Sequence, residues 1–525
     1  MNITRLNLPR RLQAIGRVCL LGALAGCDGA TAPTTTSPAP LAVHPAADPG
    51  QKTSLPPSAP SQAERIWEVY YIQGKKVGSG KTVIENVEEA GQALLRVSNQ
   101  SELTFQRGGQ ENTVKMQFVS WETKDGKLVR FTSKSVLGDG ETAATGKVAD
   151  GRLTVKTQRQ GKPLSQTLEW PGWGGYYAVE QSLRRTPLKP GEKRTIRCLQ
   201  QLLNIPADVT LTAGERETVK LPSGEQKLLK VATSIDLGGQ KLEGFAWMND
   251  RGDLLKSLQL SLELESFRST ESAAALPSEA FDLFASSVVP VKGNVNSLRD
   301  AQRATLRARV KDGKIAGVIP PCLSQRIKPL DERTVEAAII SVRPGAPAKA
   351  EDKTVQPTDD DLAPNSFVES DDAEVRKLAL AIAPDEKDAW KLACALENGV
   401  RRFITRKNFS QAFASAAEVV RSREGDCTEH AVLLAACCRC RKIPARVAAG
   451  LIYFPPAGGF AYHMWNEVWI ADRWIPLDAT LGRGGIGCDH LKITDTNLKG
   501  ADAYTAMLPI AKLFNRLELE VLKVE

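Results

Sequence analysis

The sequence predicts an α+β protein, with an antiparallel β-rich N-terminal region followed by a domain that contains helices. Two observations predict this class. Apolar and polar residues alternate in parts of the first half of the chain, whereas apolar residues recur at helical spacing after Ser366. Strands have a side-chain period of two and helices a period of 3.6. The 525 residues are 42% hydrophobic and 25% charged, which is a globular composition with room for about three domains.

The first segment, residues 1–26, is typical of an export signal. Four arginines and no acidic residue lie in residues 1–17, and the short apolar stretch Val18–Ala25 follows. Such a pattern is a secretory leader that is too short to remain as a membrane span. The segment ends in Leu24-Ala25-Gly26-Cys27, which resembles the bacterial lipoprotein signal, where the cysteine becomes the lipidated first residue. An alternative is a plain signal peptide in which Cys27 occurs by accident.

From the leader we expect an exported protein anchored to a bacterial cell membrane through lipid on Cys27, facing the periplasm or the exterior. Residues 27–64 are mostly Ala, Pro, Thr and Ser, a composition that predicts a disordered tether. The formal net charge is +8, but four of the positive charges lie in the leader. The remaining charge is too small and too evenly mixed to indicate nucleic-acid binding.

Residues 65–290 are predicted to form an antiparallel β-rich domain. Within Leu258–Leu264 leucines alternate with polar residues, as in a half-buried strand. Three dipeptides are typical of hairpin turns: Asp125-Gly126, Asp139-Gly140 and Asp150-Gly151.

A second, short β-rich segment follows at residues 291–342. Residues 343–364 are rich in proline, alanine and charge, and are predicted to be a linker whose acidic run Asp359–Asp361 is solvated.

The last predicted domain, residues 365–525, begins with helices. Asp372 is a suitable N-cap for a helix that ends before Pro384, and a second helix follows with one apolar face between Ala389 and Phe403.

The most informative segment is Arg423–Ala436. Asp426 is a suitable N-cap and Glu429 follows three residues later, as in a capping box. The residues that follow are apolar on every side, so the helix is predicted to be buried. Cys427 then occupies the first helical position, where the helix dipole favours the reactive thiolate. The alternative is that Cys427 is a structural cysteine, like Cys437, Cys438 and Cys440 on the same helix.

A reactive thiol needs a base, and the chain has only four histidines. His44 lies in the tether, and His430 follows Cys427 too closely on the same helix to turn toward the thiol. His463 begins a predicted strand that turns back at Asp472-Arg473. In that register Asp478 pairs with Glu467 and shares the face of His463, but roughly 13 Å along the strands separates them, which a bulge or a wider loop must close.

Four blocks of sequence together resemble the transglutaminase-like superfamily. They are Gly425–Ala431, Ile443–Gly450, His463–Val468 and Trp474–Thr480. The resemblance extends over roughly residues 365–500 and implies a papain-like fold, with the cysteine on a helix and the histidine and aspartate on adjacent strands. By this resemblance Cys427 is the nucleophile, His463 the general base and acid, and Asp478 the group that orients the imidazole.

The resemblance leaves several points open. Asn408 or Gln411 is the candidate side chain for the oxyanion, and Glu467 is the alternative orienting acid. No calcium-binding pattern is evident, and no cofactor and no metal are expected. Disulfide pairings cannot be assigned from the sequence; the cysteines concerned are Cys198, Cys322, Cys394 and Cys488.

The expected function is a membrane-anchored, transglutaminase-like thiol enzyme that acts on amide bonds by acyl transfer or hydrolysis through a cysteine thioester. Its substrates would be peptides or proteins. The alternative is a non-catalytic envelope protein that uses the same fold as a binding scaffold.

Overall fold

A computed structural model describes residues 63–525, apart from 108, 138–139, 160–161, 202–203, 238–240, 344–354, 408–413 and 501–505. The predicted leader, Cys27 and nearly all of the predicted tether lie outside the described residues, as do Asn408 and Gln411. Within the described part of the chain, no helix has the length and apolar character needed to span a membrane.

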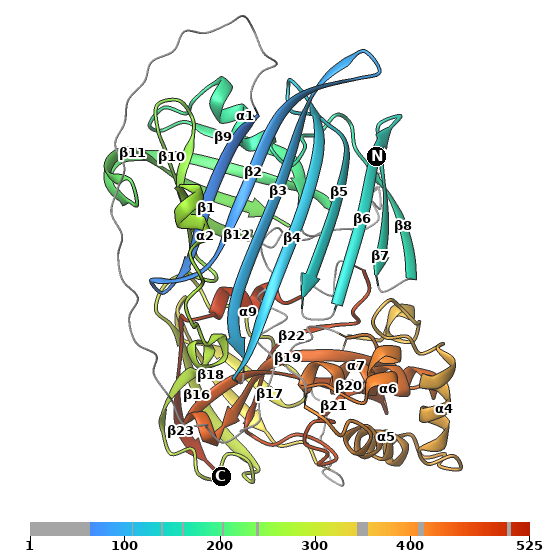
Figure 1. The fold of residues 1–525 in the computed structure, drawn as a ribbon. Coiled ribbons are helices and arrows are strands. Elements are labelled where there is room, and N and C mark those ends of the chain that lie inside the picture. Colours follow the sequence, from blue (N-terminus) through green and yellow to red (C-terminus); the bar gives the residue numbers. More distant parts are fainter. Residues whose placement is uncertain are drawn as a thin grey trace, which may run out of the picture.

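The first structural unit is an antiparallel sheet whose 14 strands all come from the described part of residues 64–269 (Figure 1). The chain enters near the middle of the sheet with β1 and adds one strand after another up to the edge strand β8. Helix α1 (Ala178–Arg185) leads to the opposite edge strand, β9, and the next strands return until β14 pairs with β1. The predicted antiparallel, β-rich N-terminal region is therefore confirmed.

The strands of this sheet have the following bounds: β1 Glu64–Ile72, β2 Lys75–Glu89, β3 Gln92–Arg107, β4 Gln110–Thr123, β5 Leu128–Leu137, β6 Gly140–Ala149, β7 Arg152–Arg159, β8 Lys162–Glu169, β9 Lys193–Gln200, β10 Ile205–Leu221, β11 Gly224–Asp236, β12 Lys241–Met248, β13 Leu254–Gln259 and β14 Leu264–Ser269.

Two of the local predictions in this region have opposite outcomes. Asp150 and Gly151 have φ of 50° and 70° and form the two-residue turn between β6 and β7, as predicted. The single strand predicted across Leu258–Leu264 is wrong, because β13 ends at Gln259 and β14 begins at Leu264. Leu262 lies in the turn between these two strands and is buried in the core. The alternation of leucines therefore continues through a turn that contains no glycine.

A second sheet of nine strands, again within the described residues, forms the base of the C-terminal unit. The chain's last strand, β23, pairs in parallel with β15 and antiparallel with β16. Residues 291–342, predicted as a short β-rich segment, therefore contribute strands to the same sheet as residues 445–496. The strand bounds are β15 Val289–Gly293, β16 Arg303–Val310, β17 Gln325–Pro329, β18 Thr334–Ile340, β19 Ala445–Phe454, β20 Gly459–Ile470, β21 Arg473–Leu477, β22 His490–Thr496 and β23 Leu517–Val524.

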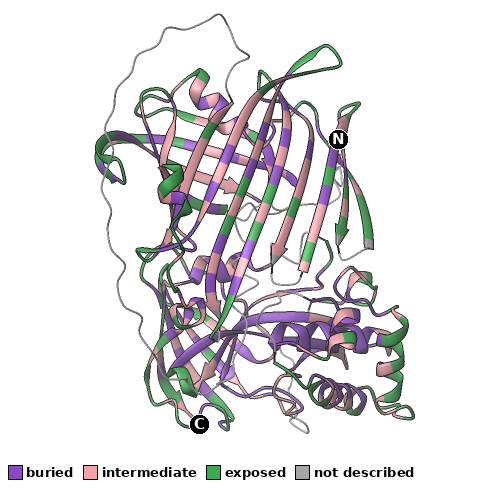
Figure 2. Cartoon of the chain, in the orientation of Figure 1, coloured by how far each residue is buried: buried purple, intermediate pink, exposed green. Residues whose placement is uncertain are grey.

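Helices pack against this second sheet and supply its core (Figure 2). Asp372 caps α4 (Ala373–Ala381) and α5 runs from Ala389 to Phe403, as predicted. Helix α7 (Cys427–Cys440) contacts β19 and β20, and every residue from Cys427 to Arg439 is buried. The other helices are α2 Glu271–Ala275, α3 Leu283–Ser287, α6 Ala416–Ser422 and α9 Leu508–Leu513, with 3-10 turns at Asp359–Asp361 and Pro455–Ala457.

The described part of the predicted linker is exposed at Val355, Gln356, Thr358 and Asp359, and residues 359–361 form a 3-10 turn. Within the acidic run, the Asp361 side chain accepts the backbone N–H of Thr358 and caps a 3-10 turn. The Trp474 ring nitrogen donates to the Val355 carbonyl oxygen at 2.8 Å and holds this segment on the second sheet. The acidic triplet thus has a local capping role that composition alone does not reveal.

Candidate active site

The candidate nucleophile, Cys427, is the first residue of α7, as predicted. The Asp426 side chain accepts the Thr428 N–H at 2.7 Å, and the Glu429 carboxylate accepts the Asp426 N–H at 3.0 Å. This confirms the predicted capping box. Glu429 also accepts the Ala414 N–H at 3.1 Å, so the start of α7 is tied to the segment before α6. These bonds fix the backbone that carries Cys427.

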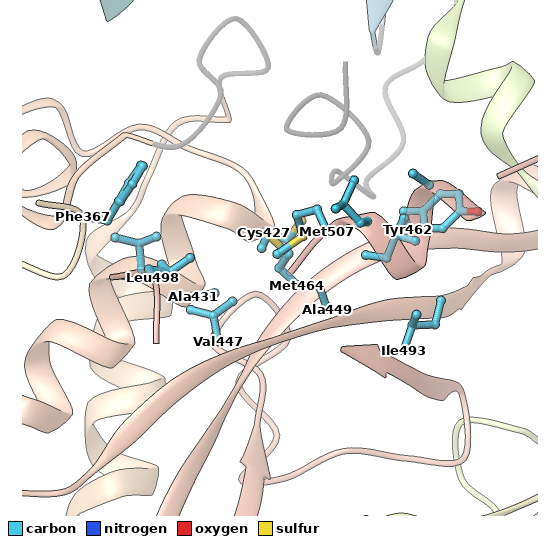
Figure 3. Packing of buried hydrophobic residues seen from close by; sticks show 14 of the residues in the cluster. Phe367, Cys427, Ala431, Val447, Ala449, Tyr462, Met464, Ile493, Leu498 and Met507 are labelled. Carbon is cyan, nitrogen blue, oxygen red and sulfur yellow. The ribbon is translucent and has the colours of Figure 1, made fainter. Parts of the chain in front are cut away.

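Cys427 lies in an apolar environment. Its side chain is 1% exposed and belongs to the hydrophobic cluster that includes Met464 and Met507 (Figure 3). The start of α7 is joined to β20 by a bond from the Asn466 amide to the Ala431 carbonyl oxygen, at 2.8 Å. Met464 and Asn466 lie on the same face of β20, so this face of the strand contacts the start of α7.

The structure brings His463 and Asp478 together. His463 Nε2 lies 2.9 Å from Asp478 Oδ2, and both side chains are buried. An ionised carboxylate only accepts hydrogen bonds, so Nε2 carries the hydrogen. His463 Nδ1 is also buried and has no hydrogen-bond partner among the described residues. This arrangement fixes the hydrogen of Nε2 toward Asp478 and leaves Nδ1 available as an acceptor.

The predicted strand register is wrong, and the observed register explains the short distance between His463 and Asp478. The turn residues are Ala471 and Asp472, with φ of 50° and 58°, and Glu467 pairs with Pro476 instead of Asp478. Asp478 follows the last pair and is level with Trp465, only about 7 Å along the strand from His463. The side chains cover this distance, and the β20–β21 pairing contains no bulge.

Asp478 is held from several sides. Its Oδ1 accepts the Thr480 N–H at 2.9 Å, and its own N–H donates to Glu397 Oε1 at 3.0 Å. Burial alone would raise the pKa of Asp478, but His463 and His490 outweigh burial and keep this pKa well below its usual range. Burial raises the pKa of Glu397 to about 7. Glu397 had no sequence signal beyond being an acid on an otherwise apolar helix face.

His490, at the start of β22, was not predicted as part of the site. Its Nε2 lies 3.2 Å from Asp478 Oδ2 and its Nδ1 lies 2.8 Å from Asp489 Oδ1. Its ring centroid is 5.9 Å from that of His463. The scarcity of histidine in the sequence was the one signal that could have drawn attention to it.

The alternative acid, Glu467, is engaged elsewhere. Its carboxylate bonds to Lys492 Nζ at 2.7 Å and to Arg446 Nε at 2.8 Å. His430 is also oriented away from this role, because its Nδ1 lies 2.6 Å from the Asp426 carbonyl oxygen on its own helix. Burial lowers the pKa of His430.

The other cysteines are structural in character. None of the eight cysteines in the described part of the chain forms a disulfide. Cys437 and Cys438 are fully buried in α7, and burial raises the pKa of both thiols far above the usual range. A buried thiol of this kind is unreactive.

The ligand atoms of His463, Asp478 and His490 lie within 4.8 Å of one another, a spacing also found around metal ions. Here hydrogen bonds account for the spacing, because the two Nε2 atoms each lie within bonding distance of the same carboxylate oxygen, Asp478 Oδ2. Nitrogens that donate hydrogen to a carboxylate do not at the same time offer a lone pair to a metal. Among the described residues this trio is therefore a hydrogen-bonded cluster.

Together these groups define the class of site: a thiol at the N-terminus of a buried helix, packed against a strand that carries a buried histidine–aspartate pair. Residues 376–479 match the model of the transglutaminase-like superfamily. The match extends from within α4 to just beyond β21 and includes all three candidate residues. The chain therefore contains a transglutaminase-like domain, which confirms the resemblance seen in the sequence.

No curated protein matches the chain. Three solved structures are similar to parts of it. A proposed cysteine protease from Cytophaga hutchinsonii is 18% identical with a TM-score of 0.26, covering 43% of this chain and 85% of that one. A beta-barrel-like protein from Brucella abortus, of a domain of unknown function, is 12% identical with a TM-score of 0.30, covering 40% and 98%. The periplasmic domain of TgpA from Pseudomonas aeruginosa, bound to ethylmercury, is 17% identical with a TM-score of 0.24, covering 35% and 76%.

Proposed function

We propose that the protein is a thiol enzyme that acts on amide bonds through a thioester on Cys427. The observation that supports this most directly is the buried bond between His463 Nε2 and Asp478 Oδ2, which leaves Nδ1 without a hydrogen-bond partner in the described part of the chain. Asp478 then orients the imidazole, and His463 acts as general base and acid. In fold terms the proposal is a papain-like α+β domain, with the cysteine on a helix and the other two residues on adjacent strands.

In the proposed reaction, His463 Nδ1 takes the thiol proton and the Cys427 sulfur attacks the amide carbonyl carbon. The tetrahedral intermediate then breaks its C–N bond, and the imidazolium returns the proton to the departing amine. Water or a second amine next attacks the thioester, giving hydrolysis or transfer, and the thiol is regenerated. Two N–H groups at the start of α7, those of Asp426 and Thr428, are used by the capping box.

The proposed substrates are peptide or protein amides, and the proposed location is the outer side of a bacterial cell membrane. The leader sequence and Cys27 support export and lipid anchoring. Several acyl chains would hold the chain stably, since one alone binds weakly.

One observation favours the alternative, a non-catalytic binding scaffold: the Cys427 and His463 side chains are 1% and 2% exposed. A substrate amide must reach the sulfur, so catalysis requires the side chains that cover Cys427 to move.

The test is the rate at which iodoacetamide alkylates Cys427 at pH 6, compared between wild type and His463→Ala. Peptide mapping must resolve Cys427 from Cys437 and Cys438, which lie in the same tryptic peptide. We expect fast labelling in wild type and at least a tenfold loss in the variant, because the His463 imidazole can accept the thiol proton as the sulfur attacks the reagent. His430→Gln is the matched control and should react like wild type. Slow labelling that His463→Ala leaves unchanged would favour the scaffold.

A further inference from the structure

Asp478 is shared by two histidines. Its Oδ2 lies 2.9 Å from His463 Nε2 and 3.2 Å from His490 Nε2. All three side chains are almost completely buried, so solvent screens their charges little. The acid of the candidate site therefore serves a second imidazole in addition to that of His463.

The two histidines differ in their other nitrogen. His463 Nδ1 has no partner among the described residues, whereas His490 Nδ1 lies 2.8 Å from Asp489 Oδ1. Each nitrogen of His490 thus meets a carboxylate oxygen, and an ionised carboxylate accepts only. Both nitrogens of His490 must carry hydrogen, which makes this ring an imidazolium.

The surroundings favour this charge. Asp489 is the acid on the far side of His490, and its other oxygen faces Arg483 at 3.3 Å and Arg299 at 3.8 Å. The Trp465 ring packs against His490 with centroids 5.3 Å apart. Burial alone would lower the pKa of His490, but Asp489 and Asp478 outweigh burial and raise it to about 9.

We propose that His490 is a positioning residue, a fixed buried cation that holds Asp478 in place and offsets its charge, so that His463 stays neutral and ready to accept the thiol proton. This inference rests on the proposed function, since it assigns His463 the role of base. It adds to the Cys–His–Asp set a second His–Asp pair, from β22 and the residue before it.

The proposal has a direct consequence for pH. Removing the positive charge of His490 leaves Asp478 uncompensated, and an uncompensated anion stabilises the protonated form of His463. With ring centroids 5.9 Å apart, we expect the titration midpoint of His463 to rise by about one pH unit. A purely structural role for His490 predicts no such shift in a variant that keeps the hydrogen bond.

The experiment is a histidine ¹³Cε1 NMR titration of the full chain, whose four histidines are few enough to assign by substitution. His490→Gln keeps a donor for Asp478 but removes the charge. Asp489→Asn keeps both histidine rings and removes the carboxylate that favours the positive charge of His490. In wild type His490 should titrate last. In both variants the His463 midpoint should rise, and the Asp489→Asn variant covers the case in which His490→Gln fails to fold.

His430→Gln is the matched control, because it removes a buried histidine that is bonded to a backbone carbonyl instead of Asp478. It should leave the His463 midpoint unchanged. A His463 midpoint that stays the same or falls in folded His490→Gln or Asp489→Asn would overturn the inference. Failure of the proposed function is distinguishable, since it would be seen as Cys427 alkylation that does not respond to His463→Ala.

Discussion

Glu397 Oε1 accepts the backbone N–H of Asp478 at 3.0 Å, although the two residues are 81 positions apart. The other oxygen of Glu397 accepts the Gly484 N–H at 2.7 Å. A carboxylate on α5 therefore fixes the chain just after β21, where it turns toward β22. The helical layer and the sheet are coupled at the residue that is hydrogen-bonded to His463.

The first prediction concerns the pH dependence of stability. The pKa of Glu397 is raised to about 7 by burial, above its ordinary value of 4.5. The stabilising contribution of this group is complete below pH 4.5 and is lost as the pH rises through about 7. The free energy of unfolding of wild type, relative to Glu397→Gln, should fall by on the order of 2–3 kcal/mol between pH 5 and 8. Urea unfolding at several pH values measures it.

Glu122 provides a matched control in the first sheet. It is also fully buried, and burial raises its pKa to about 7. Glu122→Gln should give the same pH-dependent change in stability without changing the alkylation rate of Cys427. Glu397→Gln should slow alkylation, because glutamine has one acceptor oxygen for the two N–H groups, of Asp478 and Gly484, that Glu397 holds. If the free energies of unfolding of wild type and Glu397→Gln changed in parallel with pH, the predicted effect of Glu397 on stability would be contradicted.

The second prediction separates the two candidate acids. Asp478→Asn should slow Cys427 alkylation at least tenfold, since the amide cannot hold the correct imidazole tautomer. Glu467→Gln should leave that rate near wild type. It should nevertheless lower the free energy of unfolding by about 1–3 kcal/mol, because buried Lys492 loses the charged partner at 2.7 Å and keeps Asp495 at 2.8 Å. If the two variants slowed alkylation equally, Glu467 would have to be counted as part of the candidate site.

The features predicted correctly from the sequence depend on neighbours within a few residues. The capping box of Asp426 and Glu429, the apolar surround of α7 and the turn at Asp150-Gly151 are all local, and local patterns determine them. The features that were missed depend on distant segments. Glu397 and His490 meet Asp478 only when α5, β21 and β22 are assembled, and no spacing in the sequence carries that information.

The errors at the two hairpins have a common cause. A two-residue turn of the favoured type needs positive φ at both central positions, and glycine or asparagine normally marks it. Ala471 and Asp472 adopt that geometry without either residue, and the turn before β14 has Glu263 at a φ of 52°. Without these markers the sequence places the β20–β21 turn one residue too late, which displaces the register by two residues, and it predicts a strand where a turn lies.

The third prediction follows from Ala471. Its side chain is exposed and its φ is 50°, a conformation that glycine adopts without strain. Ala471→Gly should therefore raise the free energy of unfolding by about 0.5–1 kcal/mol, measured by urea unfolding. Ala461→Gly, within β20, is the control and should destabilise by about 1 kcal/mol or more. Destabilisation by Ala471→Gly would be evidence against the turn geometry.

The fourth prediction concerns access to Cys427. Met507, 5% exposed and next to α9, lies in the apolar cluster over the thiol (Figure 3). Met507→Ala should lower the free energy of unfolding by about 2–4 kcal/mol and speed iodoacetamide labelling of Cys427 several-fold, because it opens space beside the sulfur. Met248→Ala removes an equally buried methionine from the first sheet. It should cause a similar loss of stability without faster labelling. Equal acceleration in both variants would mean that the reagent reaches Cys427 by global unfolding, and no acceleration in Met507→Ala would mean that other groups control access to the thiol.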